Sequence, residues 1–455
     1  MRCERYYLIL VLLKFNYFII IFFTISCSVL VLYSQNKIGD SLQQEKIEFF
    51  FPALEEIEQK LDLNAPSIKE SKEILNEAVS RRTIANSAKG LSASLNIGSH
   101  SIHEDRPGQG YFQSYRTIAS ISVRKPIYHW GALKAKSRIA ELTEKFAVQK
   151  SVSIRSNLVY QMKSDFMQLL YLNYKLVLEK ETLKFSEENE QKLIEKKELG
   201  LGTELEISEA TVRKLEQSII IAETERILQL EKSYFQFETG YYKALDLLIP
   251  EEFIQLCKNY EFGKNLPQLI SSHSSQDIEN LKNLIQTEKE HIKIADAALK
   301  PKINLIGGIY QDQIDLPDNP DSIRRNNFLA GIEANWNLWD SSRSKGEKSL
   351  ALSQKRTFEI QLENSIRELR LKINNHQSQL NNLANQIILS RKLTSTAKNR
   401  FQKSQIEFNE NRITINDLLS SRLILTQAEL GLFKSVFEYL QLKLEYEMII
   451  KYPNS

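Results

Sequence analysis

The residues FLAGIEANWNLWD, 328–340, alternate between apolar and other side chains over most of their length. Side chains of a β-strand alternate between the two faces of a sheet, so apolar residues at every second position predict a strand with one apolar face. The stretch is about as long as a strand that spans a bilayer, and Trp336 and Trp339 lie near one end, where membrane strands carry aromatic residues. The alternating apolar positions are Phe328, Ala330, Ile332, Ala334, Trp336 and Leu338, and the positions between them include Gly331, Glu333, Asn335 and Asn337.

The composition favours long elements over several compact domains. The 455 residues include only 15 glycines and 10 prolines, fewer than many tight turns require. The net charge is +3 and both signs are mixed along the chain, so no basic stripe indicates a nucleic-acid partner.

The N-terminus resembles an export signal. Arg2 and Arg5 precede an apolar run over residues 6–32, which predicts a leader cleaved near Ser34, with a retained membrane anchor as the alternative. Cys27 is an alternative site for a lipid anchor. Removal of the leader leaves Cys257 as the single cysteine, which excludes an internal disulfide and a thiolate metal site in the mature chain.

Strands and long helices alternate along the chain. Residues 91–98 and 117–127 alternate in polarity around a polar loop at about 101–114, which predicts a hairpin with a long loop. Residues 132–199 contain no Gly or Pro, enough for a helix on the order of 100 Å. A turn at 199–202 and a second helix from Thr203 to Leu248 complete a helical hairpin, and 251–275 reads as a connector.

The second half repeats this order at a fixed offset of 211 residues. A strand over 303–310, a polar loop over 312–327, the opening strand, a helix over 342–409 and a last helix over 414–450 follow one another. The offset places Asn411 on Gly200, Thr414 on Thr203, and Ile332 on Ile121. Agreement at separated places indicates an internal duplication.

The turn between the helices of each hairpin carries a helix-capping pattern. Thr203 with Glu206, and Thr414 with Asp417, match the spacing at which a hydroxyl and a carboxylate cap a helix N-terminus. The acidic residues therefore have a structural explanation besides any docking role.

From about residue 51 onward the sequence resembles the TolC family of outer-membrane efflux and secretion channels. The resemblance is carried by the duplicated strand, strand and long-hairpin order, by the Leu199-Gly-Leu-Gly-Thr203 turn followed by Glu206, and by Pro301 before a strand. It implies a fold that is mainly α with transmembrane β: duplicated long antiparallel helical hairpins form an α-barrel tunnel, and four strands per chain contribute to a trimeric 12-stranded β-barrel.

The resemblance also implies partners and sites. The homotrimer is expected to receive cargo from an inner-membrane transporter of the RND or ABC class through a periplasmic adaptor, or membrane fusion, protein. Asn411 replaces the glycine usual in the family, although asparagine tolerates positive φ. The family's adaptor-docking contacts match the helical tips at Gly200, Leu201, Gly202, Thr203, Glu206, Asn411, Thr414 and Asp417.

The expected organisation has seven parts. These are a leader (1–34), N-terminal periplasmic helices (35–90), a first transmembrane hairpin (91–128), a first helical hairpin (129–250), a connector (251–300), a second transmembrane hairpin (301–340) and a second helical hairpin (341–455).

No motif for catalysis appears. The six histidines are scattered, no Gly-rich phosphate loop or nucleophile elbow is present, and His100 and His103 lie in a predicted solvated loop. We therefore expect no enzyme, cofactor or metal. The family resemblance implies instead a passive outer-membrane duct of an efflux pump or type I secretion system. The alternative is a membrane-tethered coiled-coil scaffold with a small β-domain. The duct hypothesis assigns Ser92, Ser94, Ser120, Ser122, Glu333 and Asn335 to the lumen, and Leu95, Ile121, Ile332 and Trp336 to outer-membrane lipid.

Overall fold

The structure is a computed structural model that describes residues 47–108, 110–263, 275–316, 319–410 and 412–450. The leader, Cys27 and Asn411 therefore lie outside the described residues. The chain divides into two compact units. The first, here called the helical unit, contains residues up to 66, 157–269 and 374–451, and the second, the sheet unit, contains mainly 67–156 and 270–373.

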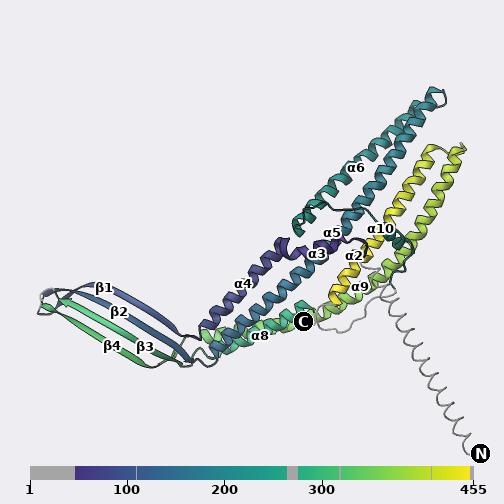
Figure 1. Cartoon of the computed structure of the whole chain (residues 1–455). Helices are drawn as coiled ribbons and strands as arrows, with labels where there is room; N and C mark the ends of the chain where they lie inside the picture. Colours follow the sequence, from purple (N-terminus) through teal and green to yellow (C-terminus); the bar gives the residue numbers. More distant parts are fainter. Residues whose placement is uncertain (1–46, 109, 264–274, 317–318, 411, 451–455) are drawn as a thin grey trace, which may run out of the picture. The chain divides into compact units, whose positions relative to one another are not determined.

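Four antiparallel strands form one sheet in the order β1-β2-β3-β4 (Figure 1). The strands alternate in polarity as expected over residues 91–98, 117–127, 303–310 and 328–335, which all fall within or beside strands. Their bounds are Ser92–Arg106 for β1, Gly110–Tyr128 for β2, Lys302–Leu316 for β3 and Asn319–Asn335 for β4.

The strands are longer than predicted at the far end of the sheet. Most of residues 101–114 and 312–327, predicted as polar loops, continue the ladder, so that Asp105 pairs with Tyr111. The prediction was wrong because polar side chains on both faces remove the alternation that marks a strand without disturbing the backbone hydrogen bonds. His100 and His103 consequently lie in β1, at positions of opposite parity and therefore on opposite faces.

Strand β4 ends earlier than predicted. It stops at Asn335, so Trp336 to Asp340 lie after the strand. Pro320 lies inside β4 and cannot donate to a ladder, which a strand at the edge of the sheet tolerates.

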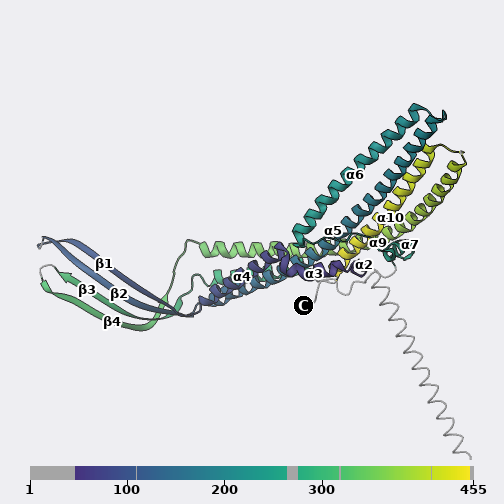
Figure 2. The same cartoon turned by 45° about the horizontal axis from the view of Figure 1, so that its top comes forward.

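Two long helical hairpins account for most of the remaining chain (Figures 1 and 2). In the first, α5 (Ala132–Glu198) pairs with α6 (Glu204–Thr239), and in the second, α9 (Arg343–Asn409) pairs with α10 (Ile415–Ile450). Helices α5 and α9 each have 67 residues, and α6 and α10 each have 36. Every one of these helix ends recurs at the offset of 211, which confirms the duplication.

Helix α6 ends at Thr239, before the predicted end at Leu248. Gly240 takes a left-handed conformation with φ 66° and caps the helix. A Cβ atom there would lie 2.7 Å from the carbonyl oxygen of Asn64. The close approach of another backbone thus requires glycine at this point and ends the helix.

Helix α7, Glu251–Asn259, lies in the segment that was predicted as a connector. It buries Phe253, Leu256 and Cys257, and Phe253 stacks on Phe437 of α10 at 5.6 Å. The prediction missed α7 because nine residues give too short a periodic signal.

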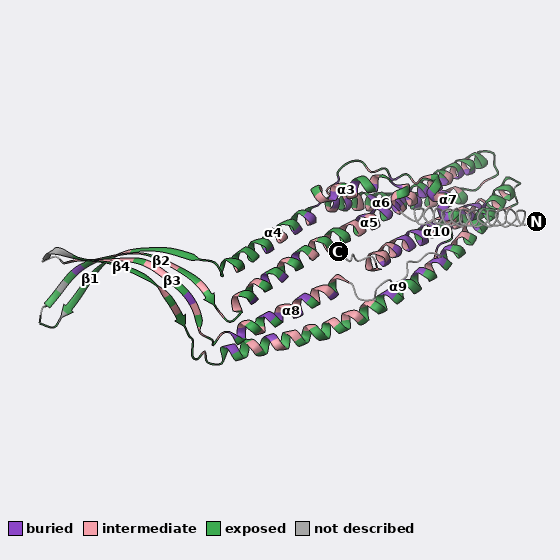
Figure 3. Ribbon diagram, turned by 60° about the horizontal axis from the view of Figure 1, so that its bottom comes forward, coloured by how far each residue is buried: buried purple, intermediate pink, exposed green. Residues whose placement is uncertain are grey.

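Among the described residues, four further helices precede the strands, three before β1 and one before β3. Figure 3 shows buried residues among exposed ones in α3, α4 and α8, and mostly exposed residues along the strands. No helix in the described ranges has an apolar stretch long enough to cross a membrane. Their bounds are Ile47–Phe50 for α2, Ala53–Asn64 for α3, Pro66–Ser87 for α4 and Gln276–Asp296 for α8.

Candidate functional site

One face of the sheet is apolar over several consecutive rows. Leu95 pairs with Ile121, Ile121 with Ile309, and Ile309 with Phe328, so these four side chains form one row. The residues predicted to face lipid are exposed there: Leu95 by 66%, Ile121 by 50% and Ile332 by 71%. An exposed apolar surface of this kind marks a site of contact with lipid or protein.

The apolar face is limited to part of each strand. On β2 it runs from Ala119 to Ile127, a length of roughly 30 Å at 3.4 Å per residue. Farther from the helices, the same face carries the row Ser99, Thr117, Gln313 and Arg324. The polar ends of the strands, predicted as loops, therefore lie beyond the apolar band.

The residues predicted to line a lumen share the opposite face. Ser94 lies across from Ser122, and their hydroxyl oxygens are 2.7 Å apart. Arg124 of β2 and Glu333 of β4 form an ion pair at 3.4 Å on the same face. Pairing through Asn304 and Gly308 places all six positions on this face: Ser92, Ser94, Ser120, Ser122, Glu333 and Asn335.

An ion pair on this polar face was not predicted. The Arg116 guanidinium donates to both carboxylate oxygens of Asp312, each at 2.8 Å. This two-pronged geometry is the strongest that arginine makes with a carboxylate, and it ties β2 to β3. The partners are 196 residues apart, and Asp312 lies in a segment predicted as a loop, so no local signal could identify the pair.

The junctions from β2 to α5 and from β4 to α9 each contain two consecutive residues in the left-handed backbone conformation. Trp130 and Gly131 have φ of 55° and 82°, and Ser341 and Ser342 have φ of 54° and 70°. The backbone N–H two residues after Trp130 donates to the carbonyl of His129 at 3.0 Å, and an equivalent 3.1 Å bond closes the second turn. Positive φ at three non-glycine residues is costly, and it persists because the surrounding structure enforces it.

Trp336 was predicted as a lipid-facing strand residue and instead follows the strand. It is 59% exposed, and its indole N–H donates to the carbonyl of Leu299 at 2.9 Å. The prediction placed it on a strand because the alternation of apolar residues continues to Leu338, past the last ladder hydrogen bond.

The tip of the first helical hairpin is built around a capping box. Gly200 has φ 75°, which suits glycine, and Glu206 accepts from the backbone N–H of Thr203 at 2.9 Å. The Thr203 hydroxyl in turn accepts from the N–H of Glu206 at 3.3 Å, which confirms the predicted cap. The hydrogen bond from the Thr203 backbone lowers the pKa of Glu206. Leu201 is 78% exposed at this tip.

The second tip carries the same cap with a shorter acid. Asp417 accepts from the backbone N–H of Thr414 at 3.1 Å and from its hydroxyl at 2.6 Å. The hydroxyl bond is the main cause that lowers the pKa of Asp417. The turn residue Asn411 lies outside the part of the chain that the structure describes.

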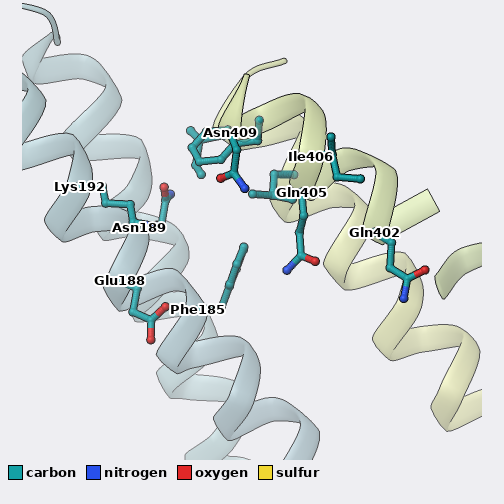
Figure 4. A pocket seen from close by; sticks show the side chains of 11 residues that line it. Phe185, Glu188, Asn189, Lys192, Gln402, Gln405, Ile406 and Asn409 are labelled. Atoms are coloured by element: carbon teal, nitrogen blue, oxygen red, sulfur yellow. The ribbon is translucent and has the colours of Figure 1, made fainter. Parts of the chain in front are cut away.

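A cavity of about 730 Å³ lies near the tips, between α5 and the second hairpin (Figure 4). Phe185 and Leu418 contribute apolar walls, and Figure 4 shows Phe185 and Asn189 directed from α5 toward Gln405 and Asn409 of α9. Asn189 is 4% exposed, and its Oδ1 has no partner among the described residues. The two hairpins are thus incompletely packed at this level.

Ring contacts and an ion pair hold the hairpins together below the cavity. The rings of Tyr174 and Phe433 lie 4.2 Å apart, and Arg422 of α10 pairs with Glu181 of α5 at 2.8 Å. These contacts fix one repeat against the other within the helical unit.

No family model matches the chain, and neither does any curated protein. Solved structures do match. CusC, described for transmembrane channel formation, has a TM-score of 0.73 and 14% identity over 88% of this chain and 93% of its own. The CmeC outer membrane channel of Campylobacter jejuni gives 0.72 and 12% over 87% and 85%. The outer membrane protein VceC of Vibrio cholerae gives 0.69 and 14% over 89% and 98%.

These matches extend over nearly the whole of both chains, with the helices and the sheet included. At 12–14% identity the agreement concerns the fold. The chain has the fold of the TolC-type outer-membrane channels, as the sequence resemblance predicted.

Proposed function

We propose that the chain is one subunit of an outer-membrane channel-tunnel, the passive exit duct of a tripartite efflux pump or a type I secretion system. The observation that carries this proposal is the sheet, which has one apolar and one polar face and two open edges. The similarity of the fold to outer-membrane channels supports it.

The open edges call for further copies of the chain. Strands β1 and β4 each pair with a single neighbour within the chain, and unpaired strand edges are not tolerated in lipid. If β1 of one copy pairs with β4 of the next, the sheet closes, and three copies supply twelve strands. A homotrimer is the state that the family resemblance implies.

Exposed apolar positions on the helices support the same assembly. Ile219 of α6 is 69% exposed, and Ile388 and Leu389 of α9 are 60% and 68% exposed. Isolated helices in water do not present such faces unless another surface covers them. A neighbouring copy that covers them would continue the wall of the tunnel.

The hairpin tips are the proposed docking point for a periplasmic adaptor protein, which links the duct to an inner-membrane RND or ABC transporter. Gly200 and Leu201 are exposed in the turn that precedes the capped helix α6. A rigid turn with an exposed leucine suits docking because little conformational entropy is lost on binding. In this proposal the chain catalyses no reaction, and small molecules or proteins pass along the polar face of its sheet.

The test is replacement of Ile332 by arginine, with Asn327→Arg as the matched control. Both change β4, but Ile332 lies on the apolar face and Asn327 lies opposite, across from Tyr310. We expect Ile332→Arg to prevent recovery of the detergent-stable oligomer from the outer-membrane fraction, because a charge on the lipid-facing side costs about 2–4 kcal/mol at mid-depth. Asn327→Arg should assemble.

Two results would reject the duct. One is normal assembly of Ile332→Arg. The other is recovery of the wild-type protein as a monomer in the inner membrane, which would favour the tethered scaffold.

A further inference from the structure

Five exposed residues form an aromatic and basic cluster at the helix-side end of the apolar face. They are here called the interfacial collar: Lys125, Tyr128, Trp130, Lys300 and Trp336. Because β1 and β3 begin at this end of the sheet and β2 and β4 finish there, all four connections to helices meet at the collar.

The register places two collar residues, Lys125 and Tyr128, on the apolar side of the sheet. Lys125 pairs with Leu305, and Leu305 pairs with Ile332, so the lysine lies in an apolar row. A bulge after Pro126 brings Tyr128 opposite Ile303, which is also on the apolar face. The collar is therefore the border of the apolar band.

The two indoles are held in place by backbone carbonyls. Trp130 donates to Pro301 O at 2.8 Å, and Trp336 donates to Leu299 O at 2.9 Å. Both indoles are thus anchored to the connection from α8 to β3. Trp130 nevertheless remains 40% exposed and Trp336 59% exposed. Tryptophan with a satisfied N–H and an exposed ring is typical of a membrane–water interface.

The lysines bring positive charge without a matching acid. The Lys300 ammonium lies 5.0 Å from the centre of the Trp130 ring, and neither Lys300 nor Lys125 pairs with a carboxylate among the described residues. The nearby acids are engaged elsewhere: Asp296 pairs with Lys348 at 2.8 Å, and Asp340 accepts from the N–H of Ser344 at 2.9 Å. Glu333 pairs with Arg124 on the opposite face.

We propose that the interfacial collar binds the headgroups of anionic phospholipids in the leaflet next to the helices. This inference rests on the proposed function, because it requires the apolar band to lie in a bilayer. The acyl chains would cover the row of Leu305 and Ile332, and the phosphates would lie beside Lys125 and Lys300. Basic groups next to a membrane-spanning segment attract anionic lipid in this way.

Fluorescence gives a direct test, because Trp130, Trp336 and Trp339 are the only tryptophans of the chain and all follow the strands. The full chain is reconstituted in vesicles of phosphatidylcholine with a minority of phosphatidylglycerol, and one of the two lipids carries brominated acyl chains that quench tryptophan. The two samples contain the same mole fraction of brominated lipid. Brominated phosphatidylglycerol should quench more strongly than brominated phosphatidylcholine, because we expect each lysine to enrich the anionic lipid locally by roughly fivefold.

The variants assign the effect to the collar. The double variant Lys125→Gln with Lys300→Gln should remove the preference and quench equally with both lipids. The matched control, Lys289→Gln with Lys398→Gln, changes two exposed lysines on α8 and α9 and should keep it. Equal quenching by both lipids in the wild type, or an unchanged preference in the collar variant, overturns the inference. Absence of quenching by either lipid rejects the membrane duct and the collar together.

Discussion

Trp130 and Ser341, 211 residues apart, both adopt a left-handed backbone conformation, with φ of 55° and 54°. Each is followed by a second left-handed residue and then by the first residues of a 67-residue helix. The two junctions have no sequence in common at these positions, so the tertiary structure, not the local residue type, imposes the turn.

This relationship predicts opposite effects for two glycine-to-alanine changes. Gly131 has φ 82° and Gly346 does not have a positive φ, and a Cβ atom would meet nothing within 4 Å at either position. Gly131→Ala should lower the free energy of unfolding by about 1 kcal/mol because the left-handed conformation is costly for alanine. Gly346→Ala, inside α9, should raise it by about 1 kcal/mol through helix propensity. Denaturation in detergent measures both, and equal signs would show that the backbone conformation does not decide the effect.

The capping boxes predict a local loss of protection at the tips. Thr203→Ala removes the acceptor for the N–H of Glu206, which should cost about 1 kcal/mol. Faster amide exchange over the first turn of α6, with unchanged exchange in the sheet, is the expected result. Thr211→Ala, which changes a hydroxyl farther along α6, should leave the first turn unchanged.

The same cap makes the tip sensitive to acid. The folded-state pKa of Glu206 lies below its ordinary value, so its stabilisation is present above the unfolded pKa and is lost as the pH falls through the folded pKa. We expect exchange in the first turn of α6 to accelerate below about pH 4 in the wild type. The acceleration should be absent in Glu206→Gln, and its persistence there would assign it to another group.

A half-buried carboxyl in the helical unit predicts the reverse pH dependence. Burial and the neighbouring Glu238 raise the pKa of Asp165 to about 7. The hydrogen bond that Gln161 donates to it at 2.8 Å acts in the opposite direction and lowers the pKa. The folded protein keeps this proton between about pH 4 and 7 while the unfolded chain releases it, so stability falls as the pH rises through this range.

Asp165→Asn should therefore stabilise the protein at pH 8 by about 2 kcal/mol, allowing for the partial exposure of the group. The gain should vanish near pH 4. Glu187→Gln, an exposed change on the same helix, is the control, and thermal unfolding at both pH values is the measurement. A pH-independent gain would contradict the titration of Asp165.

The hydrogen bonds of Arg391 in α9 are expected to limit the access of thiol reagents to Cys257. Its guanidinium donates to the carbonyls of Cys257 at 2.7 Å and Tyr260 at 2.6 Å, at the end of α7. Burial raises the pKa of the Cys257 thiol to about 12, so it should react slowly with thiol reagents. Arg391→Met leaves these carbonyls without their donor, which should release α7 and speed labelling at least tenfold.

Arg400→Met, an exposed change on the same helix, is the control and should leave labelling unchanged. Both are made with Cys3 and Cys27 replaced by serine, so that the signal comes from Cys257. Slow labelling in Arg391→Met would show that apolar packing of Phe253 alone holds α7 in place.

The sequence predicted the fold where the local pattern and the tertiary structure agree. Alternation around Ile121 and Ile332 identified strands and separated their apolar from their polar faces correctly. A strand needs one apolar face both against a protein core and against lipid, so the same pattern appears in each case. The pattern failed where both faces are polar, as at Asp105 and Asp312, and where another backbone ended a helix, as at Gly240. The Arg116 pair and the collar depend on contacts between distant segments, which no local spacing encodes.

The equal lengths of the two hairpins have a consequence for the assembled wall. If three copies assemble, six hairpins of matching length surround the axis, a pseudo-sixfold arrangement made from a threefold one. The hairpins differ at matched positions of their shorter helices, because α10 buries Leu425 and Val436 where α6 has Lys214 and Glu225. The more polar and the more apolar of these helices would alternate around the ring, so a change that loosens only one kind would separate the wall at three places rather than six.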